Sequence, residues 1–363
     1  MFDRRHVLLG ALAAGLAPAA CAGRAQDAGY VCPPCGCSMD DVVFSAPGRC
    51  PACDMVLKPM EEADLGHAPD TLPVGAGRFT LDLPGKAGVK RITVHYVRPA
   101  AFTAHSPVVL VLPGAGRNSG PYRNAWLAAA ERAGLLVAAL GYPEADFDFA
   151  QYTLGGLARS VRFENAHVER VGRAEVISMD TRDVEVIPEP DRRGWVFSGF
   201  DSVFDHLRRA SGSSQARYAA FGHSAGGQIL HRMALTGGGR KAGALIAANA
   251  GWYTLPDLSR PFPEGLAGLG LGEADLARAF ARPLTVLLGE ADDHPGAGGT
   301  FLRTPATNAQ GEGRLQRGRF FFEAAQAEAL RLSTEFNWRV ETVPGVGHDH
   351  AGMTEAAPRL LPG

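Results

Sequence analysis

A serine flanked by glycines lies in the segment 222–226, which reads Gly-His-Ser-Ala-Gly. In the G-x-S-x-G pattern, glycines let the backbone turn sharply from a strand into a helix and hold the serine hydroxyl clear of the sheet. The pattern arises by chance in a chain with 45 glycines, but here an apolar run at 218–221 precedes it and a helical pattern through 229–235 follows it. We therefore predict that Ser224 is a nucleophile and that the N–H of Ala225 helps to form an oxyanion hole.

A nucleophilic serine needs a base and an acid that orients the base. Residues 289–293 read Gly-Glu-Ala-Asp-Asp and residues 344–350 read Pro-Gly-Val-Gly-His-Asp-His. Each segment follows an apolar run that is typical of a strand, and open α/β sheets place ligands at the carboxyl ends of their strands. We predict Asp292 as the acid and His348 as the base. The neighbours that remain open for these roles are Glu290, Asp293 and His350.

The oxyanion hole requires a second N–H donor. Residues 113–116 read Pro-Gly-Ala-Gly and follow the apolar run 108–112. This segment resembles the place where hydrolases carry His-Gly-x, with a proline in place of the histidine. We predict Ala115 as the second donor.

Cysteine chemistry is confined to the beginning of the chain, because all six cysteines precede residue 54. Cys32 and Cys35 form one C-x2-C pair, and Cys50 and Cys53 form another. Two such pairs about fifteen residues apart are typical of a tetrahedral thiolate site for zinc or another thiophilic ion. So short a segment builds little core, so a metal would supply folding free energy. Disulfides or a redox pair are the alternatives.

The same segment resembles the small heavy-metal-binding domains attached to metal transporters and efflux proteins. The shared positions are Tyr30, Cys32, Pro33, Pro47, Gly48, Cys50, Pro51, Cys53, Met55 and Leu57. Cys35 stands where that pattern has His, and Asp54 where it has Gly. The resemblance implies a zinc-ribbon-like metal-binding module over residues 29–58, with Cys37 as a spare.

The first residues are typical of an export signal. Arg4 and Arg5 precede the apolar run 7–20, and small residues follow. This order is that of a secretory signal, and it resembles a twin-arginine signal over residues 1–22. A buried apolar helix or a membrane anchor is the alternative. We expect a periplasmic or secreted protein, which contacts a membrane only if Cys21 is lipidated.

The elements that must position the serine, acid and base alternate between strand and helix. Apolar runs predict strands at 78–83, 89–97, 108–112, 135–140, 218–221, 244–248, 284–288 and 338–343. Helical periodicity is found at 126–133, 200–207, 229–235 and 321–332. This alternation predicts a mostly parallel sheet covered by helices.

Three further segments complete the predicted organisation. Residues 59–77 are polar, rich in proline and glycine, and predict a linker to a catalytic domain over 78–363. Residues 158–190 predict an inserted β-hairpin or small cap. Residues 291–319 are rich in glycine and predict a long functional or mobile loop.

Several motifs in residues 78–363 together resemble the α/β-hydrolases, and most closely the polyhydroxyalkanoate-depolymerase-like and feruloyl-esterase-like serine esterases. They are the segments 112–116, 142–143, 222–228, 250–253, 289–292 and 345–348. The resemblance implies the α/β-hydrolase fold and hydrolysis of a small or polymeric ester through an acyl-Ser224 intermediate, with no cofactor for catalysis. Four aromatic residues are predicted to line an acyl pocket or to pack in the core: Tyr142, Phe147, Trp252 and Tyr253.

Composition limits the function classes. The chain has 363 residues, 46% hydrophobic and 20% charged, which is typical of a globular protein and not of a disordered one. Its formal net charge is −2, so there is no basic excess to attract nucleic acid. Two other functions stay open: a peptidase or amidase of the same fold, and a periplasmic metal-binding protein whose hydrolase domain is secondary or inactive.

Overall fold

The computed structural model describes residues 30–31, 39, 42–52, 54–59, 68–86 and 88–361. The predicted export signal at 1–22 lies outside the described residues, and so do Cys32, Cys35, Cys37 and Cys53. None of the helices within these described ranges is long and apolar enough to span a membrane.

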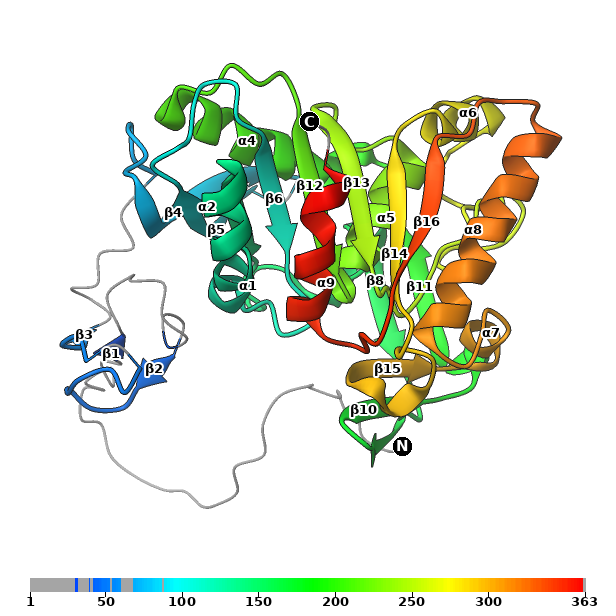
Figure 1. Ribbon diagram of the computed structural model, residues 1–363. Helices are drawn as coiled ribbons and strands as arrows, with labels where there is room; N and C mark the ends of the chain where they lie inside the picture. The colour runs from blue at the N-terminus through cyan, green and yellow to red at the C-terminus, as the bar shows by residue number, and fades with distance from the viewer. Residues whose placement is uncertain are drawn as a thin grey trace.

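An eight-stranded sheet forms the centre of the large domain (Figure 1). Its strand order is β16-β14-β13-β12-β6-β7-β5-β4. The six strands from β16 to β7 run parallel to one another, while β5 is antiparallel to both β7 and β4. The strands are β4 (Gly75–Gly85), β5 (Gly88–Arg98), β6 (Val108–Leu112), β7 (Leu136–Gly141), β12 (Tyr218–His223), β13 (Ala242–Ala248), β14 (Leu284–Gly289) and β16 (Trp338–Val343). The predicted mostly parallel sheet is confirmed.

The central strands are buried on both faces, which explains their unbroken apolar runs. In β6, Val108, Leu110 and Leu112 belong to one hydrophobic cluster. Val109 and Val111 belong to the cluster on the opposite face. Alternate side chains of one strand thus contribute to two separate cores.

Helices cover both faces of the sheet (Figure 1). The face with Val109 is covered by α1 (Ser119–Ala125), α2 (Leu127–Ala133) and α9 (His350–Ala356). The opposite face is covered by α4 (Phe197–Ser211), α5 (Ala225–Thr236), α6 (Glu273–Phe280) and α8 (Arg314–Arg331). Two single-turn helices, α3 (Phe149–Tyr152) and α7 (Pro305–Asn308), lie in the connections.

The inserted β segment is larger than predicted and includes residues from a second region. Strands β8 (Ala158–Phe163) and β11 (Val184–Pro188) form an antiparallel pair. Strands β9 (His167–Val171) and β10 (Ala174–Ser178) form a hairpin, and β15 (Gly299–Arg303) adds to β10 in parallel.

The prediction of a long loop at 291–319 is therefore wrong. This region contains β15, α7 and the first turn of α8. Phe301 of β15 is fully buried with Ala174 and Val176. In α8, buried positions are taken by Arg314 and Arg317, so the start of the helix lacks the apolar period that would have revealed it.

Three short strands pair near the beginning of the chain: β1 (Tyr30–Val31), β2 (Val43–Phe44) and β3 (Lys58–Pro59). Both β2 and β3 pair antiparallel with β1. The linker predicted at 59–77 overlaps two strands at its ends, because β3 includes Pro59 and β4 begins at Gly75; residues 60–67 lie outside the described residues.

Candidate active site

Ser224 lies in a tight turn between β12 and α5, with φ 57° and ψ −115°. The left-handed φ is strained for a non-glycine residue. Close packing imposes this turn: a Cβ on Gly222 would lie 2.3 Å from the Gly226 carbonyl oxygen, and one on Gly226 would lie 2.2 Å from that of Leu112. As the sequence predicts, both glycines are required because only a residue without a side chain allows the backbone to turn so sharply from strand to helix. The turn holds the Ser224 hydroxyl at the carboxyl edge of the sheet.

The structure brings the three predicted side chains into one hydrogen-bonded row. His348 Nε2 lies 3.0 Å from Ser224 Oγ, and His348 Nδ1 lies 2.8 Å from Asp292 Oδ2. Asp292 follows β14, and His348 follows β16. The Asp292 side chain is fully buried and that of His348 is 4% exposed. A neutral His348 in this row can donate Nδ1–H to Asp292 and accept the Ser224 proton on Nε2.

The neighbouring candidates for acid and base have other partners. Glu290 accepts a hydrogen bond from the Thr342 hydroxyl. Asp293 pairs with His294. His350 begins α9, where its ring stacks on that of Tyr122 at a centroid separation of 4.3 Å. The geometry therefore favours Asp292 and His348 for the two roles.

Asn249 holds the acid and base turns together, and the sequence analysis missed it. It follows β13, is fully buried and has φ 47°. Its Oδ1 accepts from the Gly289 N–H at 2.8 Å, and its Nδ2 donates to the Gly347 carbonyl at 3.0 Å. The signal that could have found it is a polar residue at the end of a buried apolar strand.

Burial and charge favour the neutral form of the His348 ring. Burial lowers the pKa of His348, and the positive charge of Arg314 lowers it further. Hydrogen bonding to Asp292 acts in the opposite direction but does not outweigh burial. A neutral imidazole next to a hydroxyl is the state that a general base requires.

The loop that carries Ala115 passes directly beside Ser224. A Cβ added to Gly114 would lie 3.4 Å from Ser224 Cβ. Ala225 is the first residue of α5, so its N–H has no carbonyl partner within the helix. The two predicted oxyanion donors thus belong to segments that flank the serine.

Tyr122 links these two segments and is a further residue that the sequence analysis missed. Its buried hydroxyl accepts from the Gly114 N–H at 2.9 Å and lies 2.9 Å from Nδ1 of His223, the residue before Ser224. Burial raises the pKa of the Tyr122 phenol, so it remains protonated. One hydroxyl therefore sets the distance between the Gly114 loop and the nucleophile turn.

We expect Tyr122→Phe to lower kcat about tenfold with little change in KM. This loss is smaller than the ~100-fold or greater loss in kcat that follows when an oxyanion donor is removed outright. The change frees the Gly114 N–H, so the Ala115 donor shifts. Tyr142→Phe is the matched control, because the Tyr142 hydroxyl is also buried but has no hydrogen-bond partner among the described residues. Equal kcat values for the two variants would show that Tyr122 does not hold the loop.

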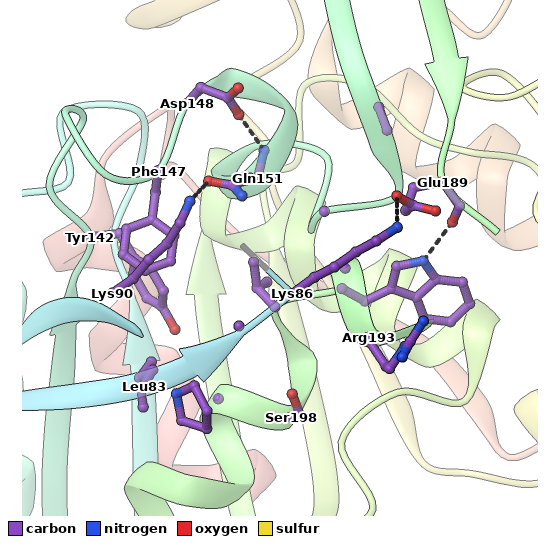
Figure 2. Close-up of a pocket in the computed structure, with 18 of the residues that line it drawn as sticks. Leu83, Lys86, Lys90, Tyr142, Phe147, Asp148, Gln151, Glu189, Arg193 and Ser198 are labelled. Carbon is purple, nitrogen blue, oxygen red and sulfur yellow. Dashed lines mark hydrogen bonds and ion pairs between the residues drawn. The ribbon is translucent and has the colours of Figure 1, made fainter. Parts of the chain in front are cut away.

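Of the four aromatic residues predicted to line an acyl pocket or the core, Trp252 and Tyr253 are buried in the core. Tyr142 and Phe147 are also buried, but they line a pocket of about 440 Å³ next to the hairpin of β4 and β5 (Figure 2). Ser224 does not line this pocket.

Two lysines reach from that hairpin to the opposite wall of the pocket (Figure 2). Lys86 Nζ lies 2.9 Å from the buried Glu189 carboxylate. Lys90 donates to the Gln151 side chain. These polar links join the hairpin to the segments that precede α4, and the pocket is distinct from the Ser224 site.

Of the four predicted metal ligands, only Cys50 is described, and it lies buried in a tight turn. The Cys50 N–H donates to the Met55 carbonyl, and the Asp54 N–H donates to the Cys50 carbonyl, both at 2.8 Å. Asp54 has φ 58°, which explains why heavy-metal-binding domains have glycine at this position. Cys50 and Leu57 form a small cluster with Tyr30, Met39 and Phe44.

Comparisons with known proteins find matches both for the segment at the beginning of the chain and for the large domain. The family model of the heavy metal binding domain matches residues 30–60. The chain is 34% identical to poly(aspartic acid) hydrolase-1 from Sphingomonas sp. KT-1, covering 80% of this chain and 99% of that one, with a TM-score of 0.66. It is 32% identical to a poly(3-hydroxybutyrate) depolymerase from Bordetella parapertussis, covering 79% and 89%, also with a TM-score of 0.66. No match is found among curated proteins.

Proposed function

Because the chain belongs to the α/β-hydrolases related to poly(3-hydroxybutyrate) depolymerase, we propose that it cleaves carboxylic esters through an acyl intermediate on Ser224. The observation that carries this proposal is the hydrogen-bonded row of Ser224, His348 and Asp292, at 3.0 and 2.8 Å. Such a row can raise the nucleophilicity of the hydroxyl without a cofactor.

In the proposed reaction, His348 Nε2 takes the proton as Ser224 Oγ attacks the carbonyl carbon. Asp292 stabilises the resulting imidazolium through Nδ1–H. The N–H groups of Ala225 and Ala115 donate to the oxyanion of the tetrahedral intermediate. His348 then returns the proton to the leaving alcohol, and water releases the acyl group by the same steps in reverse order.

The nature of the scissile bond separates this proposal from a second candidate. The depolymerase relative acts on a polyester, while poly(aspartic acid) is an amide-linked polymer, which favours amide hydrolysis as the alternative. A p-nitrophenyl ester series of rising acyl length, measured beside the matching p-nitroanilides, decides between them. We expect the esters to be cleaved with the higher kcat/KM. A preference for the anilides would identify an amidase.

We further propose that the beginning of the chain is an export signal followed by a metal-binding module. Cys32, Cys35, Cys50 and Cys53 would hold one zinc or similarly thiophilic ion, which would stabilise the fold of the module. The match of residues 30–60 to the heavy metal binding domain supports this assignment. The protein would then act in the periplasm or outside the cell, on a small or polymeric ester.

We expect deletion of residues 30–60 to remove bound metal and to leave esterase activity largely intact. The reason is that Ser224, Asp292 and His348 all lie at the edge of the large sheet, while the module has its own small cluster around Cys50. Elemental analysis and p-nitrophenyl ester kinetics measure the two effects. The matched variant in the full chain is Cys50→Ser, which should lose the metal and keep the activity.

Two results would count against this account of the module. Protein without metal and without free thiols would show a disulfide-linked segment. A truncated protein that folds but no longer hydrolyses esters would show that the module contributes to the active site.

A further inference from the structure

Arg314 is a cation in a place where a charge is costly. It is the first residue of α8, and its side chain is fully buried. A buried guanidinium is tolerated only when charged and polar acceptors surround it. One of its acceptors is the Asp292 carboxylate, which is also fully buried, at 3.0 Å from Nη1 to Oδ1.

The three hydrogen bonds of Arg314 join the acid to a second segment. Nη1 donates to Asp292 Oδ1, while Nη2 donates to the carbonyls of Gly298 at 3.0 Å and Thr300 at 2.8 Å. The next residue adds a main-chain bond, from the Leu315 N–H to the Asp292 carbonyl at 2.9 Å. The start of α8 therefore holds both the side chain and the backbone of the acid.

This second segment, residues 298–300, lies directly against the ring of His348, the predicted base. Gly299 sits between the two carbonyls that Arg314 binds and has φ 64°. A Cβ at Gly299 would lie 2.7 Å from His348 Cδ2 and 2.8 Å from Nε2. The backbone at this position thus forms a wall in contact with the ring of the base, and only glycine leaves room for that ring.

From these contacts we infer that Arg314 is a positioning residue for the reaction, which orients the acid through its carboxylate and the base through the segment 298–300. This inference rests on the proposed function. Asp292 offers Oδ2 to His348 and Oδ1 to Arg314, so the guanidinium fixes the rotation of the carboxylate. Catalysis by such a row is sensitive to displacements of about 1 Å.

The charge of Arg314 has an additional effect on the base. Burial is the main cause of the lowered pKa of His348, and the positive charge of Arg314 is the next; the carboxylates of Asp292 and Asp349 act in the opposite direction. The buried His223 ring also faces His348, at a centroid separation of 4.7 Å. Removing that charge raises the pKa of His348, so the ring becomes protonated at a higher pH. Since the reaction requires the neutral ring, the acid limb of kcat/KM moves to higher pH.

Arg317 provides a matched control on the same helix. Its side chain is also fully buried, and both guanidinium groups lie over the Phe301 ring, at 4.9 Å for Arg314 and 4.2 Å for Arg317. Arg317 donates to the carbonyls of Gly251, Leu302 and Gly311, none of which belongs to the serine, acid or base. Replacing it removes a buried cation of the same kind without touching Asp292.

The test compares Arg314→Met with Arg317→Met in the full chain. Three quantities are measured: the pH profile of kcat/KM, the melting temperature, and the low-field proton resonance of the hydrogen bond between His348 and Asp292. We expect both variants to have a lower melting temperature than the wild type. Only Arg314→Met should lower kcat, by about 100-fold, shift the acid limb to higher pH and lose the low-field resonance.

If Arg314→Met does not fold, Arg314→Lys and Arg317→Lys take the place of the two methionine variants. Lysine keeps the charge beside Asp292 but cannot reach all three acceptors. Arg314→Lys should therefore keep the acid limb close to that of the wild type while lowering kcat more than Arg317→Lys does.

Equal profiles for the Arg314 and Arg317 variants, or an unchanged resonance after loss of Arg314, would overturn the inference. The resonance does not depend on turnover. A wild-type protein that shows it but hydrolyses neither esters nor anilides would contradict the proposed function alone.

Discussion

Replacing Ser224 with alanine is expected to lower kcat by about 10⁴-fold or more and to leave the protein folded. The Ser224 hydroxyl is the oxygen at hydrogen-bond distance from His348 Nε2, so its removal leaves the base without a nucleophile to activate. The turn itself is set by the close packing of Gly222 and Gly226, and alanine keeps the Cβ that this turn already accommodates. Steady-state kinetics on a p-nitrophenyl ester and thermal melting measure the two effects.

Ser202→Ala is the control for Ser224→Ala. Ser202 lies on α4, and its hydroxyl donates to the carbonyl of Ser198 in the same helix. Its replacement should change neither kcat nor the melting temperature appreciably. A Ser224→Ala variant that retains wild-type turnover would mean that another group is the nucleophile.

Replacement of His348 should have the second largest effect, and replacement of His350 should be tolerated. His348→Asn removes the proton acceptor that lies 3.0 Å from Ser224 Oγ, and kcat should fall by about 10⁴-fold. His350→Asn removes a ring stacked on Tyr122 and its hydrogen bond to the Pro121 backbone, and neither involves Ser224, so we expect a cost of about 1 kcal/mol of stability. The two kcat values, measured at the pH optimum of the wild type, decide the ranking. The reverse order would assign the base to His350.

The sequence predicts the parts of the site that depend on local structure. Ser224 was found because a buried strand, a glycine-flanked turn and a helix follow one another within a few residues. Asp292 and His348 are predicted because each directly follows an apolar run that is typical of a strand. Neighbouring parallel strands have their carboxyl ends at the same edge of a sheet. The turns that carry Ser224, Asp292 and His348 are therefore expected to lie close together even when no distance between them is known.

The residues that hold these turns in place could not be found in the same way. Arg314 contacts Asp292 across 22 positions of sequence, and Tyr122 contacts His223 across 101. A single arginine at the start of a helix has the pattern of an exposed residue, because its burial depends on acceptors from distant segments. The polar first turn of α8 concealed the helix for the same reason, and β15 became a strand only through its pairing with β10.

The central claim is that Ser224 is the group that becomes acylated, and covalent labelling tests it most directly. The protein is incubated with a fluorophosphonate, its intact mass and remaining activity are followed over time, and the labelled peptide is then sequenced by mass spectrometry. The account predicts one label per chain, attached to Ser224, with activity lost in proportion to labelling and no label on Ser224→Ala. An enzyme that remains active after treatment, or one that carries the label on a different residue, would contradict it.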